Sequence, residues 1–361
     1  MREGWIKTNI GSAFHIQQGK TLAISKLMGG KYPVYGANGI VGYFDEFNFD
    51  FPVTGLGCRG SCGTIYYIDS KAFLANNVMA IWEKDASKID SRYIPLALGN
   101  VDLIASGAIS GQVQPQITKQ GLEPVAITIP PLPEQKRIVD LISSVDSYIE
   151  ALQQQLGSAK TSRNAVLHEL LTAGGDDWVE HKLIDMFEIY QPQTIAKSLM
   201  SDDGEFIVFG ANGPIGRYNE FNHDEPEVVV TCRGATCGTV NMTPPKTWIT
   251  GNAMVVSPKT SEVSKEFLYW ALVAGVDIQS VISGSAQPQI TREGLASVKI
   301  KIPPLSIQKE IVDLISGFEL NISNSEETLN NAKSLRSGLL SDLLSGEHEI
   351  PASYDKVIGA A

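Results

Sequence analysis

The chain has 361 residues, with 29 Lys and Arg against 40 Asp and Glu, which gives a formal net charge of −11. At roughly 100–200 residues per domain, this length predicts two or three domains with sizeable cores. Hydrophobic residues make up 43% and charged residues 19%, which excludes wholesale disorder, and no apolar run reaches the ~20 residues that span a bilayer.

Residues 1–133 predict a β-rich globular part. Short β-type runs such as Gly63–Ile68 are separated by Gly, Asn and Pro, the residues that end strands and form turns. The same segment carries three glycine- or glutamine-containing motifs. These are the turn YGANGIVGYFDEF from Tyr35, the loop CRGSCGT from Cys58, and QPQIT from Gln114.

Residues 134–172 predict a long spacer helix, because they contain no proline and repeat apolar side chains with the 3.5-residue period of a coiled-coil seam. Pro130, Pro131 and Pro133 stop the helix from starting earlier. Glu134 then places a negative charge in the first turn, where the helix dipole favours it. The predicted seam positions are Ile138, Ile142, Val145, Ile149, Leu152, Leu156, Ala159, Arg163, Val166 and Leu170.

The second half of the chain repeats the first at an offset of 173 or 174 residues, beginning with Trp5 and Trp178. Motifs that recur in one order at nearly one offset indicate an internal duplication. The matched motifs are GANG at Gly36 and Gly210, CRG at Cys58 and Cys232, QPQIT at Gln114 and Gln287, and IVDLI at Ile138 and Ile311.

The duplication predicts a second β-rich part over residues 177–305 and a second spacer helix over residues 306–346. The tail, residues 347–361, has no counterpart in the first copy, and we assign it no role. The seam positions of the second helix are Ile311, Ile315, Phe318, Ile322, Ser325, Leu329, Ala332, Arg336, Leu339 and Leu343.

A lone helix with such a seam would leave a long apolar face in water, so we expect the two spacer helices to pair. We predict an α+β fold in which two β-rich parts are separated by an antiparallel coiled coil, with an internal pseudo-two-fold repeat. A helix of ~37 residues spans roughly 55 Å. The alternative is a helical hairpin packed within each part's own core.

Arg163 and Arg336 occupy the same seam position in the two copies. A charged seam residue costs stability but fixes the register, so we expect each guanidinium to reach an acidic group or a partner protein. The alternative is that both side chains extend to solvent.

Matched loops carry side chains of the types that contact nucleic-acid bases and phosphates. Arg59 and Arg233 lie in glycine-flanked loops, where an arginine can bind guanine or a phosphate, and glutamine can pair with adenine. Asn-Gly is first of all a turn signal, and structural turns or polar loops are the alternative in each case. The candidate residues are Asn38, Arg59, Gln112, Gln114, Gln116 and Lys119 in the first copy, and Asn212, Arg233, Gln287, Gln289 and Arg292 in the second.

The layout resembles the specificity subunit of type I restriction–modification systems. The resemblance is strongest in the turn Tyr35–Phe47, the CRGSCGT loop, and the junction IPPLPEQKRI (Ile129–Ile138). The second copy of the junction reads IPPLSIQKEI, with Ile307 in place of Glu134. The resemblance implies two target-recognition domains that each read half of a bipartite site in double-stranded DNA, with helices that act as a ruler and dock methyltransferase subunits.

The same resemblance implies partners that hold the chemistry. We expect two methyltransferase (modification) subunits and restriction/translocase subunits, with S-adenosylmethionine, ATP and Mg²⁺ bound by these partners and no cofactor in this chain. The net charge of −11 is unusual for a protein that binds DNA alone, so we expect weak binding by the isolated chain.

The sequence segments that resemble catalytic or metal-binding motifs lack residues or spacings that those motifs require. Gly19-Lys20-Thr21 lacks the first glycine of a phosphate-binding loop, and the cysteine pairs have spacings unlike those of a zinc site. No signal-like apolar stretch follows Met1, so we expect a cytoplasmic protein that contacts no membrane and keeps its thiols reduced. The alternatives are a coiled-coil scaffold without DNA recognition and, more remotely, a self-sufficient nuclease or methyltransferase.

Overall fold

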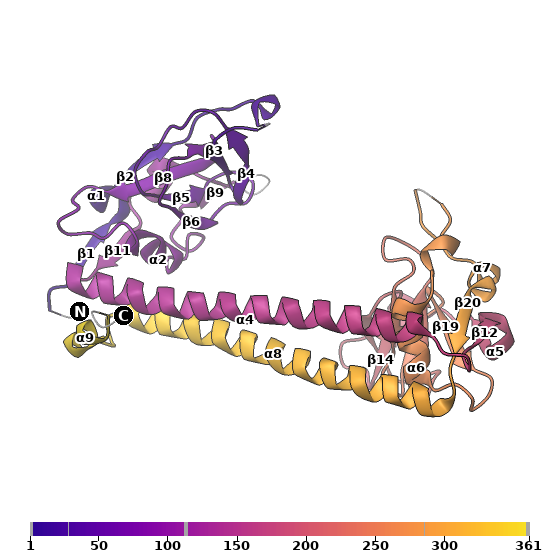
Figure 1. The fold of residues 1–361 in the computed structure, drawn as a ribbon. Helices are drawn as coiled ribbons and strands as arrows, with labels where there is room; N and C mark the ends of the chain where they lie inside the picture. The colour runs from indigo at the N-terminus through magenta and orange to yellow at the C-terminus, as the bar shows by residue number, and fades with distance from the viewer. Residues whose placement is uncertain (1–2, 28, 112–114, 285, 359–361) are drawn as a thin grey trace. The chain divides into compact units, whose positions relative to one another are not determined.

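The computed structural model describes residues 3–27, 29–111, 115–284 and 286–358. The chain divides into two compact units, one of residues 1–152 with 328–361 and one of residues 153–327. Two long helices, α4 (Leu132–Ala173) and α8 (Leu305–Ser345), each contribute a segment to both units (Figure 1). The domain limits that the sequence predicts stay predictions.

The β-rich part of the first unit has its strands in two larger sheets and two strand pairs. The four-stranded sheet has the order β2-β8-β5-β6, with β2 (Phe14–Gln18), β8 (Val78–Glu83), β5 (Val53–Gly57) and β6 (Ile65–Ile68). The three-stranded sheet has the order β4-β3-β7, with β4 (Gly39–Phe44), β3 (Tyr32–Gly36) and β7 (Phe73–Leu74). The antiparallel pairs are β1 (Ile6–Asn9) with β11 (Ala126–Ile129), and β9 (Ile109–Ser110) with β10 (Gln116–Ile117).

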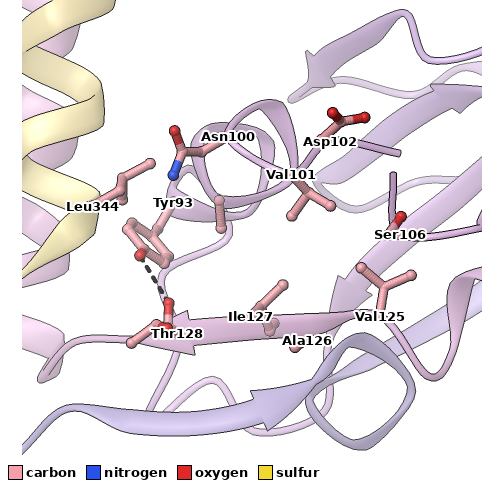
Figure 2. Close-up of a pocket in the computed structure, with 11 residues that line it drawn as sticks. Tyr93, Asn100, Val101, Asp102, Ser106, Val125, Ala126, Ile127, Thr128 and Leu344 are labelled. Carbon is pink, nitrogen blue, oxygen red and sulfur yellow. Dashed lines mark hydrogen bonds between the residues drawn. The ribbon is translucent and has the colours of Figure 1, made fainter. Parts of the chain in front are cut away.

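The first unit also contains short helical segments. They are α1 (Ile10–Ala13), the 3₁₀ turn η1 (Ile24–Lys26), α2 (Tyr93–Gly99) and α3 (Lys119–Leu122). The fully buried Tyr93 of α2 donates its hydroxyl to the Thr128 carbonyl of β11 at 3.2 Å, beside a cavity of about 310 Å³ (Figure 2). This contact seats α2 on the strand that leads into α4.

The second unit repeats this topology strand for strand in its larger sheets. Its four-stranded sheet has the order β13-β19-β16-β17, with β13 (Phe187–Tyr190), β19 (Ala253–Pro258), β16 (Val228–Thr231) and β17 (Val240–Met242). Its three-stranded sheet has the order β15-β14-β18, with β15 (Pro214–Tyr218), β14 (Phe206–Phe209) and β18 (Trp248–Ile249). Strand β12 (Val179–Lys182) pairs with β20 (Lys299–Ile302), as β1 pairs with β11.

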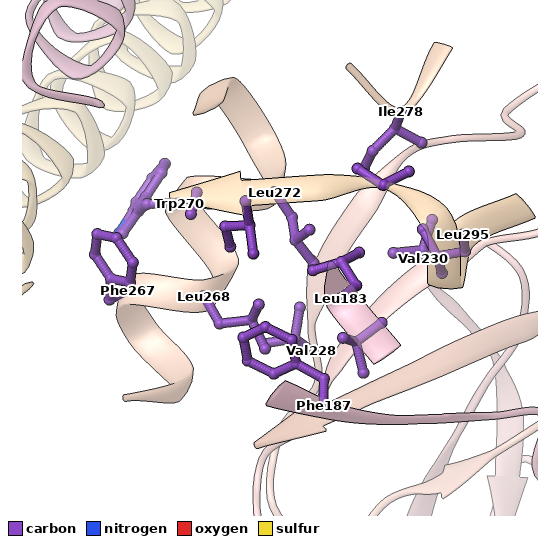
Figure 3. Close-up of a cluster of buried hydrophobic side chains, with 14 of the residues drawn as sticks. Leu183, Phe187, Val228, Val230, Phe267, Leu268, Trp270, Leu272, Ile278 and Leu295 are labelled. Carbon is purple, nitrogen blue, oxygen red and sulfur yellow. The ribbon is translucent and has the colours of Figure 1, made fainter. Parts of the chain in front are cut away.

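The core of the second unit lies between the four-stranded sheet and its helices. Phe187, Val228 and Val230 of the sheet pack against Phe267, Leu268 and Leu272 (Figure 3). The short helical segments of this unit are α5 (Leu183–Met186), η2 (Lys197–Leu199), α6 (Lys265–Trp270) with the π-helical turn η3 (Ala271–Gly275), η4 (Gln279–Val281) and α7 (Arg292–Ser297). Together the two units confirm the predicted mixed fold with an internal repeat.

The long helices pair antiparallel within each unit. In the first unit, the start of α4 meets the end of α8, where Ile138 and Ile142 share a buried cluster with Leu343 and Leu344. In the second unit, the end of α4 meets the start of α8, and Leu167 shares the core with Ile311 and Ile315. Every predicted seam position is buried or half-buried, which confirms the coiled-coil prediction.

Both seam arginines reach acidic groups. Arg336 forms a two-pronged ion pair with Asp146 in the first unit, and Arg163 pairs with Glu319 in the second. The Arg163 guanidinium also lies 5.7 Å from the ring centroid of Trp270. The predicted acidic partners are thus confirmed, and the arginines do not simply extend to solvent.

The helices begin slightly earlier than the prolines suggested. Helix α4 starts at Leu132, and Pro133 lies in its first turn. Proline is tolerated there because the backbone N–H groups of a first turn have no acceptor within the helix. Glu134 is buried and accepts a hydrogen bond from Trp5 Nε1 at 3.0 Å. Its position in the first turn is therefore used for a contact as well as for the helix dipole.

The tail packs on the first unit. It contains η5 (Ala352–Tyr354) and α9 (Asp355–Ile358). Ile350 is buried in the cluster that holds Tyr93, and Asp355 accepts two hydrogen bonds from Arg137, both at 2.7 Å. Among the described residues, no helix is both long and apolar enough to cross a membrane.

Candidate nucleic-acid interface

Two predicted contact motifs meet in the first unit. Arg59 follows β5, and its backbone forms an isolated antiparallel bridge with Gln116. Next to this bridge, the Ile117 N–H donates to the Cys58 carbonyl at 2.9 Å. The arginine loop and the glutamine segment therefore form one surface, although more than fifty residues separate them along the chain.

The Asn-Gly hairpin joins the same surface. Asn38 lies in the turn between β3 and β4, and its Oδ1 accepts a hydrogen bond from Thr64 Oγ1 at 3.3 Å. A Cβ on Gly57 would come within 2.5 Å of the Ala37 carbonyl oxygen. Glycine at 57 therefore lets the hairpin turn lie directly against the arginine loop.

The second unit builds the same three-part surface. Arg233 forms a backbone bridge with Gln289, and the Ile290 N–H donates to the Cys232 carbonyl at 3.0 Å. Asn212 Oδ1 accepts from Asn241 Nδ2 at 2.9 Å.

One position of this surface differs in chemistry between the copies. Thr231 stands where the first copy has Gly57, and its hydroxyl donates to the Ala211 carbonyl. The hairpin contact is thus made by a hydroxyl in the second unit and by close approach at a glycine in the first.

Two short helices present the basic residues. Lys119 opens α3 and Arg292 opens α7, and both helices are capped by threonine hydroxyls. Thr118 accepts from the Gly121 N–H at 3.1 Å, and Thr291 accepts from the Gly294 N–H at 3.0 Å. The caps fix the direction in which each helix leaves the glutamine segment.

Most of the predicted contact side chains are exposed. Gln112 and Gln114 lie outside the described residues. Within the described residues, neither Arg59 nor Arg233 forms an ion pair with a carboxylate. The exposed candidates are Asn38, Arg59, Gln116 and Lys119 in the first unit, and Asn212, Arg233, Gln287, Gln289 and Arg292 in the second. Their role as DNA contacts stays a prediction.

The cysteines of these loops support the fold of the surface. Cys58 Sγ accepts from Gln18 Nε2 at 3.2 Å, and Cys232 Sγ accepts from Gln191 Nε2 at 3.2 Å. Burial raises the pKa of the Cys58 thiol, which keeps it protonated and unreactive. Among the described residues, no three His, Cys, Asp or Glu side chains gather as a metal site.

Gln18 and Gln191 are contacts that sequence reasoning missed. Each carboxamide also donates to a backbone carbonyl, of Asn76 in the first unit and of Gly251 at 3.0 Å in the second. The available signal was their spacing, because they stand 173 residues apart like the motifs they support. The cavity beside Tyr93 lies elsewhere, and none of the predicted contact residues that the structure describes lines it.

Known proteins are similar to this chain in sequence. The family model for the type I restriction modification DNA specificity domain matches residues 2–159 and 175–333. A putative type I specificity subunit of Mycoplasma pneumoniae is 23% identical over 359 residues, which cover 94% of this chain and 96% of that protein. A putative type I restriction enzyme specificity subunit of Methanocaldococcus jannaschii is 22% identical over 265 residues, 65% of this chain and 62% of that protein.

Solved structures agree in fold. The S subunit of a type I restriction–modification system from M. genitalium has a TM-score of 0.64 at 20% identity, covering 94% of this chain and 96% of that one. A chain from a structure of complex assembly and conformational transition of the type I R-M system has a TM-score of 0.61 at 15% identity, covering 95% and 98%. With both copies of its repeat matched by the family model, this chain belongs to the type I restriction modification DNA specificity family.

Proposed function

We propose that the chain is a non-catalytic, cytoplasmic specificity subunit that reads a bipartite site in double-stranded DNA. The observation that carries this proposal is the surface of hairpin turn, arginine loop and glutamine segment, which occurs once in each unit. Because the surfaces share their backbone contacts while the two copies differ in sequence, they suit two half-sites that are held in like geometry and need not match in sequence.

The exposed side chains suit DNA recognition. Arginine can fork onto the O6 and N7 atoms of guanine, and glutamine can pair with the N6 and N7 atoms of adenine. Lys119 and Arg292 suit phosphates on either side, where contacts position the protein and carry no sequence information. Each surface therefore combines base-reading and phosphate-binding groups.

The paired helices suit a ruler and a docking surface. Helix α4 has 42 residues, a length of about 63 Å at ~1.5 Å per residue. Large apolar side chains remain exposed on the helices, including Tyr148, Leu320 and Leu335, as expected of a surface that a partner covers. We propose that two methyltransferase subunits dock there, joined by restriction/translocase subunits. S-adenosylmethionine, ATP and Mg²⁺ would be held by these partners.

Co-purification with a methyltransferase followed by footprinting tests the proposal. We expect two protected tracts on one DNA, separated by an unprotected gap. A single tract, or none, would contradict it.

The same experiment distinguishes this function from the alternative function. A coiled-coil scaffold without DNA recognition is favoured only by the exposed apolar helix residues. It would co-purify with proteins and leave no footprint.

A further inference from the structure

A buried glutamine joins the spacer helix to the recognition part in the first unit. Gln135 lies in the first turn of α4 and is fully buried. Its Oε1 accepts from the Asp90 N–H at 2.9 Å, and its Nε2 donates to the Lys88 and Pro130 carbonyls, both at 2.8 Å. One carboxamide thus ties the helix to the loop before α2 and to the end of β11.

The second unit has the same joint. Gln308 is fully buried in the first turn of α8. Its Oε1 accepts from the Ser264 N–H at 3.0 Å, and its Nε2 donates to the Glu262 and Pro303 carbonyls, both at 2.8 Å. All three bonds correspond to those of Gln135.

The residues around the two glutamines are not alike. Glu134 stands where the second copy has Ile307, and Arg137 where it has Glu310. The Trp5–Glu134 bond and the Arg137–Asp355 pair therefore stabilise only the first joint. What the two joints share is the glutamine and the main-chain groups it binds.

The chemistry explains why glutamine suits this place. A carboxamide offers an acceptor and two donors in one plane, so three fixed partners define its orientation. Because the carboxamide is fully buried, water cannot replace a hydrogen bond that it loses, so each broken bond destabilises the joint. The joint is therefore stiff in angle as well as tight in contact.

We infer that Gln135 and Gln308 are positioning residues that set the gap between the two half-sites. This inference rests on the proposed bipartite recognition. A helix segment of about 20 residues is about 30 Å long. A rotation of about 10° at the joint therefore moves the far end of that segment by about 5 Å. That displacement exceeds the ~3.4 Å rise of one base pair, so each joint angle decides which gap length lets both surfaces bind.

The test is a gap-length series bound by the complete complex with its methyltransferase. Gln135→Leu removes all three hydrogen bonds at similar volume, and Gln308→Leu does the same in the other unit. On DNA that carries only one half-site, we expect each variant to bind as tightly as the unchanged protein does. On DNA that carries both, each variant should lose at least tenfold in its preference for the best gap over a gap one base pair longer. Gln155→Leu, at an exposed position of α4, is the matched control and should keep the preference.

The outcomes separate the inference from the proposed function. If a leucine variant fails to fold, the asparagine variant at the same position, Gln135→Asn or Gln308→Asn, keeps the carboxamide and shortens its reach, and it should also weaken the gap preference. If the substituted proteins fold and keep the full preference for the best gap, the inference about Gln135 and Gln308 is wrong, while the proposed function stands. If the complex that contains the unsubstituted protein does not protect two tracts separated by a gap, the proposed bipartite recognition is wrong instead.

Discussion

Arg59 and Arg233 are held in matching loops whose backbones are bridged to the glutamine segments. We expect Arg59→Ala to weaken binding to one half-site and Arg233→Ala to weaken binding to the other, each by about 1–3 kcal/mol if they read bases. Binding measured against DNAs with one half-site altered at a time distinguishes the two. Small, equal losses on every sequence would show that the arginines bind phosphates.

His223 gives the second unit a pH-dependent stability. Its Nε2 lies 2.8 Å from the Tyr190 hydroxyl. Burial lowers the pKa of His223, the Glu227 carboxylate raises it by less, and the Lys265 ammonium adds a still smaller lowering. As pH falls through the ordinary histidine value, the unfolded chain binds the proton first, so the free energy of unfolding decreases. At higher pH the imidazole is neutral in both states, and this contribution is complete.

His223→Phe should remove that pH dependence. Phe49, the buried counterpart of His223 in the first copy, shows that this repeat accepts phenylalanine at the position. Urea unfolding between about pH 5 and 8, the range in which histidine titrates, measures the effect. An unchanged slope in the variant would show that other groups carry it.

At the residue scale, exposed candidates could be predicted from the sequence, while buried polar contacts could not. Arg59 and Gln116 were identified by residue type and repetition. Gln135 and Gln308 were not, because a glutamine in the sequence looks the same whether it faces solvent or is buried against three main-chain groups. Only the tertiary neighbours distinguish the two cases.

At the element scale, the seam of the long helices was predictable because apolar period and helix length are written in consecutive residues. Ile315 and Leu314 test it as neighbours in α8, since Ile315 is fully buried and Leu314 is 48% exposed. Ile315→Ala should lower the free energy of unfolding by about 2–5 kcal/mol, and Leu314→Ala by less than about 0.5 kcal/mol. Denaturant unfolding of both variants checks this, and equal losses would contradict the assigned seam.

Two ion pairs between the long helices match the register of the helix pair. Asp146 and Glu319 are matched positions of the two copies, as are Arg163 and Arg336, so the duplication supplies each ion pair once per unit. The sequence indicated that the arginines needed acidic partners. It did not reveal which carboxylates would lie opposite, because this depends on the stagger of two segments far apart in the chain.

At the scale of the whole molecule, the ruler proposal predicts a change of gap with helix length. One heptad inserted in each helix, between residues 146 and 163 and between residues 319 and 336, adds about 10 Å and keeps both ion pairs. The preferred gap should lengthen by about three base pairs, at ~3.4 Å each, in a binding series of gap lengths. A heptad inserted in one helix alone should break the pairing instead, and an unchanged gap in the double insertion would exclude the ruler.

The sequence by itself determined the duplication, the β-rich parts, the long helices and their seam, because each is a local or periodic pattern of residue types. The tertiary structure decided how segments far apart in the chain combine. It brought the arginine loop, the glutamine segment and the hairpin turn to one surface, folded the tail against Tyr93, and buried Gln135 and Gln308 at the helix joints. The physical reason is that hydrogen-bond partners and burial are properties of neighbours in space, which no spacing along the chain specifies.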